Sequence, residues 1–242
     1  MSEQKSWVVI VLSYNEEKTI QRVINELISI FEKTTIDYDI VIIDDGSTDN
    51  TKSVLQNYNE YNKIRVISHD RNLGIGYSLV EGYKLGKNNI IGMVPGDGQF
   101  EIALLKEAIR LFGEDDELKL VSFYRDLNNV YSTFRKLVTK IQKTINLFVL
   151  GVKFKDVNWV KFLRMDILGN KDFCMKSSLI ETEIMYIVTL KKYKFIELPS
   201  NYLSREVPRS RLSFIKSLLL ASKDVFNLFK LKRYYKKLHK QY

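Results

Sequence analysis

The sequence predicts an α/β protein built on a mostly parallel central sheet with helices on both faces. Short runs of β-branched and apolar residues, typical of buried strands, alternate four times with segments whose apolar residues recur every three or four positions, as on one face of a helix. Each of these runs is followed by a cluster of polar residues, and ligands of parallel α/β sheets bind at the carboxyl ends of strands. Together these observations favour a ligand-binding α/β fold.

Four strand–helix units are predicted in the first half of the chain. Asp49 is the expected N-cap of the short second helix, because an Asp side chain can accept a hydrogen bond from the first turn. The predicted strands are 7–12, 39–43, 64–67 and 90–94, and the predicted helices are 20–31, a short one through Val54 and Leu55, 77–85 and 102–112.

The second half of the chain is less regular. Strands are expected at 118–123, 157–162 and 194–198, a basic amphipathic helix at 133–150, another helix at 179–190, and helical spacing from Ile215 to Phe229. We therefore predict one domain over residues 1–211, with halves 1–115 and 116–211, followed by a basic, amphipathic helical extension over residues 212–242.

Cysteine and histidine are too scarce for several kinds of chemistry. Cys174 is the single cysteine, which fits a reducing compartment, and we expect it to be a small buried residue. His69 and His239 are the two histidines, so neither a structural zinc site nor a Ser-His-Asp arrangement is expected. An enzyme of this composition would use carboxylates, amides, arginines and a hard metal ion.

The net charge of +9 is concentrated near the C-terminus. Residues 225–242 carry six basic side chains and no acidic one, interspersed with aromatic and aliphatic residues. This pattern predicts an interfacial helix on an anionic membrane surface, with a core-packed helix as the alternative. No nucleic-acid recognition motif accompanies the charge, so nucleic acid is not an expected partner. Neither a signal peptide nor a spanning apolar segment is expected.

Two of the polar clusters carry the chemistry. Asp44 and Asp45 follow a predicted buried strand, where a turn needs at most one such residue, and their carboxylates could accept hydrogen bonds from a base or a ribose. Asp97 and Gln99 follow the fourth strand in a glycine-rich turn, and their oxygens suit Mg²⁺ or Mn²⁺ bound to a diphosphate. Ordinary turns are the alternative interpretation of both clusters.

Four segments together resemble the family 2 glycosyltransferases, in order and in spacing over about the first 100 residues. They are residues 8–17 (VVIVLSYNEE), 41–51 (VIIDDGSTDNT), 72–76 (NLGIG) and 96–99 (GDGQ). The resemblance implies a Rossmann-like fold of the GT-A type, a nucleoside held by Tyr14, Glu16 and Asp45, and a metal ion on Asp97 with Gln99. Pro95 stands where the family usually has the first Asp of Asp-x-Asp, which predicts weaker metal binding.

Segments of the second half are similar to the polyprenyl-phosphate glycosyltransferases, the dolichol-phosphate mannose synthase group. These are residues 155–164 (KDVNWVKFLR), the stretch containing Glu181 and Glu183, and residues 205–212, which end in RSRL. A lipid phosphate is already a nucleophile, so it needs cations more than a base. The candidate cations are Arg125, Arg135, Arg205 and Arg211, of which the resemblance points most firmly to Arg211. For Arg125 and Arg135 the alternative is a solvated surface arginine. A hydroxyl acceptor would need a base, for which Glu181 or Glu183 is the candidate.

The predicted function is inverting transfer of a hexose from a UDP- or GDP-sugar to a polyprenyl phosphate by a cytoplasmic, peripherally membrane-associated enzyme. Transfer to a glycan hydroxyl and non-catalytic binding of a nucleotide sugar are the alternatives, and a homo-oligomer or a membrane-protein partner stays open. The catalytic candidates are Asp97, Arg211 and Glu183, and the metal-binding candidates Asp97 and Gln99. The substrate-binding candidates are Tyr14, Asn15, Glu16, Asp44, Asp45, Gly46, Ser47, Asn72, Gly74, Gly98, Arg125, Arg135, Glu181, Arg205 and Ser210.

Overall fold

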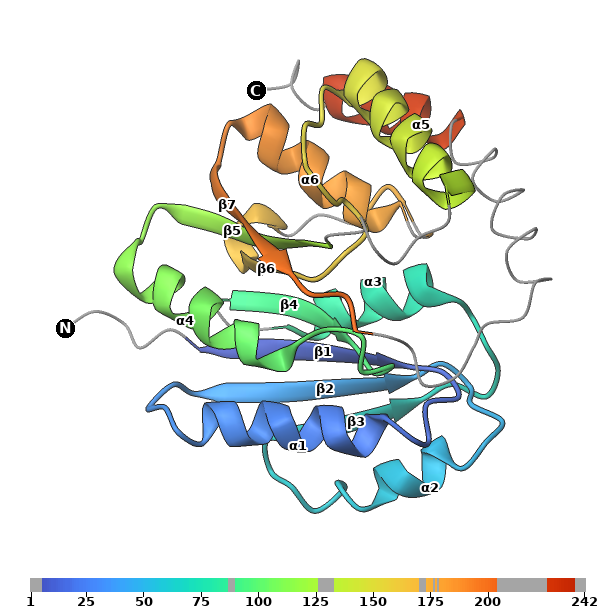
Figure 1. Cartoon of the computed structure of the whole chain (residues 1–242), viewed down its shortest axis with the longest axis vertical. Coiled ribbons are helices and arrows are strands. Elements are labelled where there is room, and N and C mark those ends of the chain that lie inside the picture. Colours follow the sequence, from blue (N-terminus) through green and yellow to red (C-terminus); the bar gives the residue numbers. More distant parts are fainter. Residues whose placement is uncertain are drawn as a thin grey trace.

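The computed structural model describes residues 6–86, 90–125, 133–169, 173–175, 177, 179–203 and 226–237 (Figure 1). The strands are β1 (Trp7–Ser13), β2 (Tyr38–Asp44), β3 (Ile64–Ser68), β4 (Ile90–Pro95), β5 (Leu118–Arg125), β6 (Lys161–Arg164) and β7 (Lys194–Ser200). The helices are α1 (Ile20–Phe31), α2 (Thr51–Gln56), α3 (Ile75–Leu85), α4 (Leu105–Glu114), α5 (Thr133–Leu150) and α6 (Ile180–Lys191), with 3-10 turns η1 (Ile102–Leu104) and η2 (Met165–Ile167). Residues 226–237 form a further helix.

One seven-stranded sheet runs through both halves of the chain, in the order β3-β2-β1-β4-β6-β5-β7. The first four strands in this order are parallel, β6 is antiparallel to β4 and to β5, and β5 and β7 are parallel. The predicted mostly parallel α/β sheet is therefore confirmed. The change of polarity falls in the second half, where the sequence pattern is irregular.

The alternation of side chains along β1 divides the core into two layers. Trp7, Val9 and Val11 pack into the core beneath α1 and α4, whereas Val8 and Ile10 pack into the core beneath α3 and α6. Successive side chains of a strand point to opposite faces, so a strand of apolar residues needs cover on both sides. Helices on both faces of the sheet supply that cover (Figure 1).

A third layer covers α6. Each residue from Ile180 to Val188 is buried. A helix that packs only against a sheet would leave its outer face exposed, so α6 must be covered on both sides. Leu150 of α5 and Leu228, Leu231 and Tyr235 of residues 226–237 belong to the same apolar cluster as α6. In Figure 1, α5 and this C-terminal helix lie at the end of the molecule beyond α6.

The strand register brings the polar clusters to one edge. In the pairing of β1 with its two neighbours, Ser13 lies opposite Asp44 and Leu12 lies opposite Pro95, and Asp44 in turn lies opposite Ser68 of β3. All four parallel strands therefore end within a residue or two of one another. The predicted gathering of four polar segments at one carboxyl edge is confirmed.

Two local predictions are wrong. The strand expected over residues 157–162 begins at Lys161, because the preceding segment forms turns whose carbonyl oxygens accept hydrogen bonds from the Lys161 ammonium. The N-cap of α2 is Asn50, not Asp49. Asp49 still accepts a hydrogen bond from the Thr51 N–H at 2.9 Å, one position before the cap.

Candidate active site at the carboxyl edge of the sheet

The loops after β1 and β2 are tied together by reciprocal hydrogen bonds. The Asn15 N–H donates to Ser47 Oγ at 2.9 Å, and the Thr48 N–H donates to Asn15 Oδ1 at 2.8 Å. Asn15 adopts a left-handed backbone with φ of 57°, which Asn tolerates better than most residues. These contacts leave the neighbouring Tyr14 ring exposed at the edge, at 42% of its surface, where it could stack on a base.

The two adjacent aspartates have different roles. Asp44 is buried, and its Oδ1 accepts hydrogen bonds from the Ser47 hydroxyl and, at 3.1 Å, from the Ser47 N–H. Asp45 reaches toward the loop after β3, where it accepts hydrogen bonds from the N–H groups of Leu73 and Gly74 at 2.9 and 2.8 Å. Asp44 therefore shapes the turn, and Asp45 joins two loops of the edge.

Backbone conformation explains two glycines of the edge, and close backbone packing adds a second reason at Gly46. A Cβ on Gly46 would lie 2.4 Å from the carbonyl carbon of Arg71, and the φ of Gly46 is +73°. Gly74 has a φ of 92° and precedes the first residue of α3. At Gly46 only glycine allows both the positive φ and the close contact without strain. The segment containing Arg71 and Asn72 can therefore lie directly against the turn that carries Asp44 and Asp45.

Glu16 lies where α1 begins. It is buried, its N–H donates to Thr51 Oγ1 at 2.9 Å, and its carbonyl oxygen accepts the Ile20 N–H at 2.9 Å. Thr19 then donates from its hydroxyl to the Gly96 carbonyl oxygen at 2.8 Å. The start of α1 is thereby connected to both the second and the fourth polar cluster.

Asp97 and Gln99 occupy a tight turn after β4. The Gln99 N–H donates to Asp97 Oδ1 at 3.1 Å, and Gly98 between them has a φ of +70°. The Gln99 side-chain amide donates to the Leu203 carbonyl oxygen at 3.3 Å, and the Leu203 N–H donates to the Gln99 carbonyl oxygen at 3.1 Å. The turn thus connects the carboxyl edge of the sheet with the chain beyond β7.

These residues fit a divalent ion that takes most of its ligands from a substrate. Across the residues that the structure describes, no group of three or more His, Cys, Asp or Glu side chains could hold a metal ion. The Asp97 carboxylate and the Gln99 amide oxygen are hard donors, and Mg²⁺ is commonly bound by one or two carboxylates together with substrate phosphates and water. A site of this kind would need a diphosphate to complete it.

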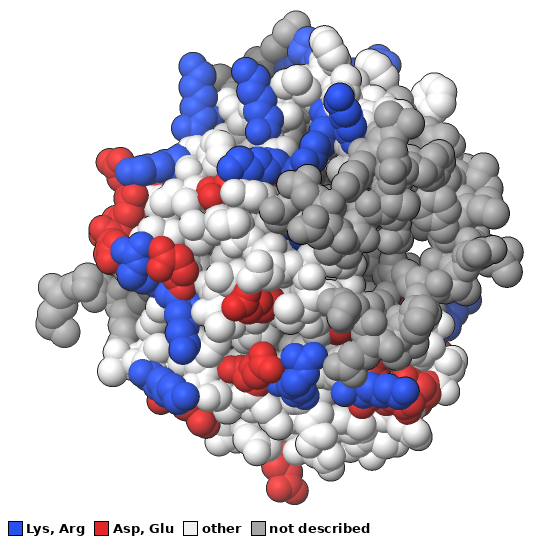
Figure 2. Space-filling view, viewed as in Figure 1, with Lys and Arg blue, Asp and Glu red and all other residues white. Residues whose placement is uncertain are grey.

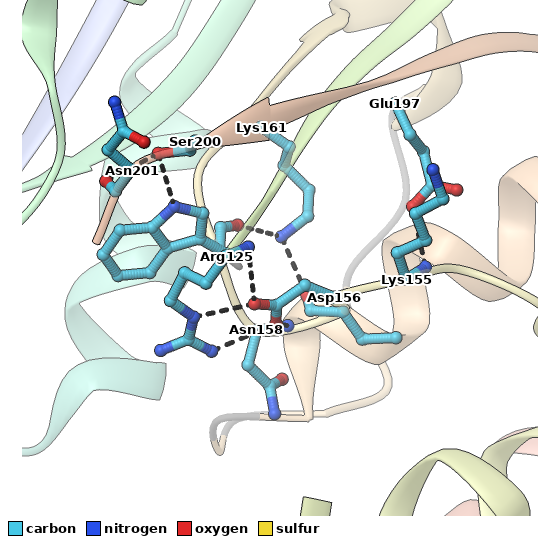
Figure 3. Close-up of polar contacts among 10 residues, drawn as sticks. Arg125, Lys155, Asp156, Asn158, Lys161, Glu197, Ser200 and Asn201 are labelled. Carbon is cyan, nitrogen blue, oxygen red and sulfur yellow. Dashed lines mark hydrogen bonds and ion pairs between the residues drawn. The ribbon is translucent and has the colours of Figure 1, made fainter. Parts of the chain in front are cut away.

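Arg125 is fixed at the end of β5 by a bidentate ion pair (Figure 3). Its Nε and Nη2 donate to the two carboxylate oxygens of Asp156 at 2.7 and 3.1 Å. Its guanidinium carbon lies 4.5 Å from the ring centroid of Trp159 and 5.8 Å from that of Tyr202. A guanidinium held on two sides in this way keeps its orientation when an anion approaches.

A buried lysine holds the segment that carries Asp156. Lys161 is 1% exposed, and its Nζ donates to the carbonyl oxygens of Val157 and Trp159 at 3.0 and 2.8 Å (Figure 3). The same Nζ also donates to Glu181. Burial lowers the pKa of Lys161 to about 7. The three acceptor oxygens around Nζ oppose this effect, because they match the three N–H donors of the charged ammonium form. The signal for this residue is a single charge within the otherwise apolar run Val160–Leu163, and it was missed in the sequence-based prediction.

Glu181 and Glu183 lie inside the core of the second half. Glu181 pairs with Lys161 and accepts the Tyr83 hydroxyl at 3.3 Å. Glu183 is fully buried and accepts the N–H groups of Cys174 and Met175 and the Tyr235 hydroxyl, at 2.9, 2.8 and 2.8 Å. Burial raises the pKa of Glu183 despite these donors. This arrangement argues against the predicted substrate contact of Glu181 and the predicted base role of Glu183.

Several predicted residues are not placed by the structure. Arg205, Ser210 and Arg211 lie outside the described residues, and Arg135 lies on α5 at a position whose side chain is not described. Their roles stay predictions. A residue that the sequence analysis missed is His69, which directly follows β3 and contacts Asp45. Its place at the end of a predicted strand was the available signal.

The fold and this edge define an α/β protein whose four parallel strands bring their loops to one edge of the sheet. The family model described as Glycosyl transferase family 2 matches residues 8–169. The chain belongs to family 2 of the glycosyltransferases, and its fold is of the GT-A type.

Curated relatives share part of their length with this chain. Dolichyl-phosphate beta-glucosyltransferase ALG5D of Trichomonas vaginalis is 28% identical over 156 residues, which are 59% of this chain and 48% of that protein. The dolichyl-phosphate beta-glucosyltransferase of Mus musculus is 35% identical over 105 residues, which are 40% of this chain and 32% of that protein. The chain therefore matches about half or less of the length of these relatives, and it resembles the polyprenyl-phosphate hexose synthases.

Solved structures share the fold. Glucosyl-3-phosphoglycerate synthase of Mycobacterium tuberculosis, in complex with Mn²⁺, uridine-diphosphate and glucosyl-3-phosphoglycerate, superposes with a TM-score of 0.68 at 17% identity, covering 93% of this chain and 78% of that chain. Its complex with Mn²⁺, UDP-glucose and glycerol 3-phosphate has a TM-score of 0.69 at 16% identity, with the same coverage. At this identity the likeness concerns the fold alone.

Proposed function

We propose that the chain transfers a hexose, with inversion at the anomeric carbon, from a UDP- or GDP-sugar to a polyprenyl phosphate at the cytoplasmic face of a membrane. The donor half of the proposal is supported by the interlocked edge loops around Tyr14, Asp45 and Asp97. The acceptor half is supported by relatives whose names give dolichyl phosphate as the acceptor.

The reaction requires little proton transfer. A phosphate oxygen of the acceptor attacks the anomeric carbon from the side opposite the leaving group, a C–O bond forms, and the bond from that carbon to the donor diphosphate breaks. A divalent ion on Asp97 and Gln99 would neutralise the leaving diphosphate. Arg125, oriented by Asp156, and the predicted Arg211 would offset the repulsion between the two phosphate groups.

The observation that carries the lipid acceptor is an outward face with exposed apolar side chains beside basic ones. Phe148 of α5 is 80% exposed and Phe226 is 81% exposed. Phe226 and Phe229 line a groove of about 410 Å³ together with Lys230 and Arg233. Figure 2 shows basic side chains gathered at the end of the molecule where α5 and α6 lie. Aromatic rings beside lysines favour the boundary between lipid headgroups and acyl chains.

The helices that carry this exposed face pack against the core with their other side. Leu228, Leu231 and Tyr235 are buried on the opposite side of the C-terminal helix, so one face of this helix packs into the core and leaves the other available for the proposed membrane contact. None of the helices in the described part of the chain combines the length and the apolar composition needed to span a bilayer. A peripheral contact through this face is what we propose.

Incubation with radiolabelled UDP- and GDP-hexoses and a short-chain polyprenyl phosphate tests the transfer. We expect label to move into the organic phase with one of the donors. Label that reaches a glycan acceptor instead would support the hydroxyl-acceptor alternative. Nucleotide binding without turnover on any acceptor would support the non-catalytic alternative, and either result would overturn the proposed function.

Replacing Phe226 and Phe229 together with serine is expected to weaken binding to vesicles containing anionic lipid by about tenfold or more. Each ring would lose the free energy of burial in the interface, roughly 1.5–3 kcal/mol for complete burial of such a side chain. Vesicle co-sedimentation measures the effect. Tyr61→Ser is the matched control, because Tyr61 is 51% exposed in the turn before β3, on the far side of the sheet order. Unchanged vesicle binding of the double variant would contradict the membrane contact.

A further inference from the structure

His69 is held between two carboxylates at the donor edge. Its ring Nδ1 lies 2.8 Å from Asp45 Oδ1, and its Nε2 lies 2.7 Å from Glu81 Oε2 of α3. The Tyr77 ring meets the imidazole edge-on, with centroids 5.6 Å apart, and the His69 N–H donates to the Asp44 carbonyl oxygen at 2.9 Å. The imidazole side chain is 8% exposed. Its position is therefore fixed from three elements.

Both ring nitrogens of His69 face carboxylate oxygens, an arrangement that favours a proton on each of them. An ionised carboxylate can only accept hydrogen bonds, so a nitrogen without a proton would face an oxygen lone pair. Burial alone lowers the pKa of His69, but the hydrogen bonds and charges of Glu81 and Asp45 outweigh it, and the net pKa lies above the usual imidazole value. The protonated imidazole matches both carboxylates, and its Nδ1 contact holds Asp45 in place.

The hydrogen bonds of Asp45 leave one acceptor position open. A carboxylate offers about four lone-pair positions, two on each oxygen. Among the described residues, His69 and the Leu73 N–H occupy Oδ1, and the Gly74 N–H occupies one position of Oδ2. The Asp45 side chain keeps 9% of its surface exposed, close to the exposed Tyr14 ring. A base that contacts Asp45 can therefore place one N–H on Oδ2.

The number of N–H groups separates the two candidate bases. Guanine presents its ring N1–H and its exocyclic amine side by side and would use both oxygens of a carboxylate, whereas uracil presents the single N3–H. We infer that His69 is a positioning residue that makes Asp45 selective for uracil, so that the donor is a UDP-sugar and GDP binds poorly. This inference rests on the proposed function, namely that a nucleotide sugar binds at this edge.

The same geometry gives the binding a defined dependence on pH. When the pH rises through the elevated pKa of His69, one of its two carboxylate contacts loses its proton and becomes repulsive. The charged groups facing the ring are Asp45 from the loop after β2 and Glu81 from α3, and both favour the protonated form. UDP affinity should accordingly be retained at low pH and fall as His69 deprotonates.

Calorimetry with UDP and with GDP in the presence of Mn²⁺ tests the inference on the full chain and two variants. The wild type should bind UDP about tenfold or more tightly than GDP, because guanine would leave a buried donor unpaired. In His69→Leu, Oδ1 regains an open position, and the ratio of the two affinities should fall toward one. His69→Asn still presents an N–H to Asp45 but does not titrate, so it should prefer UDP and lose the dependence of UDP affinity on pH that the wild type shows.

The outcomes separate this inference from the proposed function. Equal or tighter GDP binding by the wild type, or an unchanged pH profile in His69→Asn, overturns the role of His69 while leaving the transferase proposal intact. If His69→Leu does not fold, the pH profiles of the wild type and His69→Asn still decide the question. Failure of the wild type to bind either nucleotide would instead contradict nucleotide-sugar binding itself, and the inference would fall with it.

Discussion

Asp97→Ala is expected to lower kcat/KM for sugar transfer by about two to three orders of magnitude, the loss that follows removal of one group stabilising a developing charge. Asp97 lies in the turn directly after β4, between Gly96, which packs against the Leu12 carbonyl oxygen, and Gly98, whose φ is +70°. Its Oδ1 orients the turn through the Gln99 N–H. Because Pro95 supplies no second carboxylate, the whole negative charge offered to a metal ion at this turn comes from Asp97.

The measurement is the rate of transfer at saturating Mn²⁺ and its dependence on Mn²⁺ concentration, with the thermal unfolding midpoint recorded in parallel. Asp116→Ala is the matched control, because Asp116 lies in the turn before β5 at the opposite edge of the sheet. Wild-type rates in Asp97→Ala would remove the metal-binding role from this residue. A strongly lowered thermal unfolding midpoint would instead show that the activity is lost because the turn containing Asp97 no longer folds correctly.

Lys161→Met is expected to destabilise the fold by about 3–5 kcal/mol, the cost of leaving a buried partner charge uncompensated. Glu181 would keep the Tyr83 hydroxyl but lose the ammonium, and the carbonyl oxygens of Val157 and Trp159 would lose their donor. The turns that carry Asp156 depend on those carbonyl contacts. Urea-induced unfolding followed by circular dichroism gives the change in free energy.

Two further variants isolate the buried charge. Lys161→Met combined with Glu181→Gln removes both charges while keeping an acceptor for Tyr83, so it should recover a large part of the lost stability. Lys119→Met on neighbouring β5 removes a lysine whose ion pair with Asp166 is exposed, and should cost no more than about 1 kcal/mol. Equal changes in the free energy of unfolding for Lys161→Met and Lys119→Met would show that the buried ion pair contributes no more to stability than the exposed one.

Much of the edge could be predicted from residue order. Polar segments after apolar strands identified Tyr14, Asp45 and Asp97 as neighbours, since parallel strands joined by helices have to end at the same side of the sheet. Glycine marked the positions where backbone approaches backbone, as at Gly46. Local chemistry and strand polarity were sufficient for these inferences.

Contacts within the second half could not be predicted in the same way. Glu181 and Glu183 look like ordinary charges near the start of a helix, yet both are buried because α5 and residues 226–237 cover α6 from outside. Their partners Lys161 and Tyr235 lie 20 and 52 residues away along the chain. Nothing in the local pattern indicates such a third layer.

The fold class, the four-strand edge and the family follow from the sequence, because each depends on periodicity and on short local motifs. Which carboxylates are available to a ligand depends on the tertiary structure. Burial and hydrogen-bond partners, which residues distant in the chain supply, placed Glu183 in the core, paired Arg125 with Asp156, and set His69 against Asp45. The residue type gives a side chain its charge. The number of its lone pairs that a ligand can reach depends on the groups that the fold places beside it.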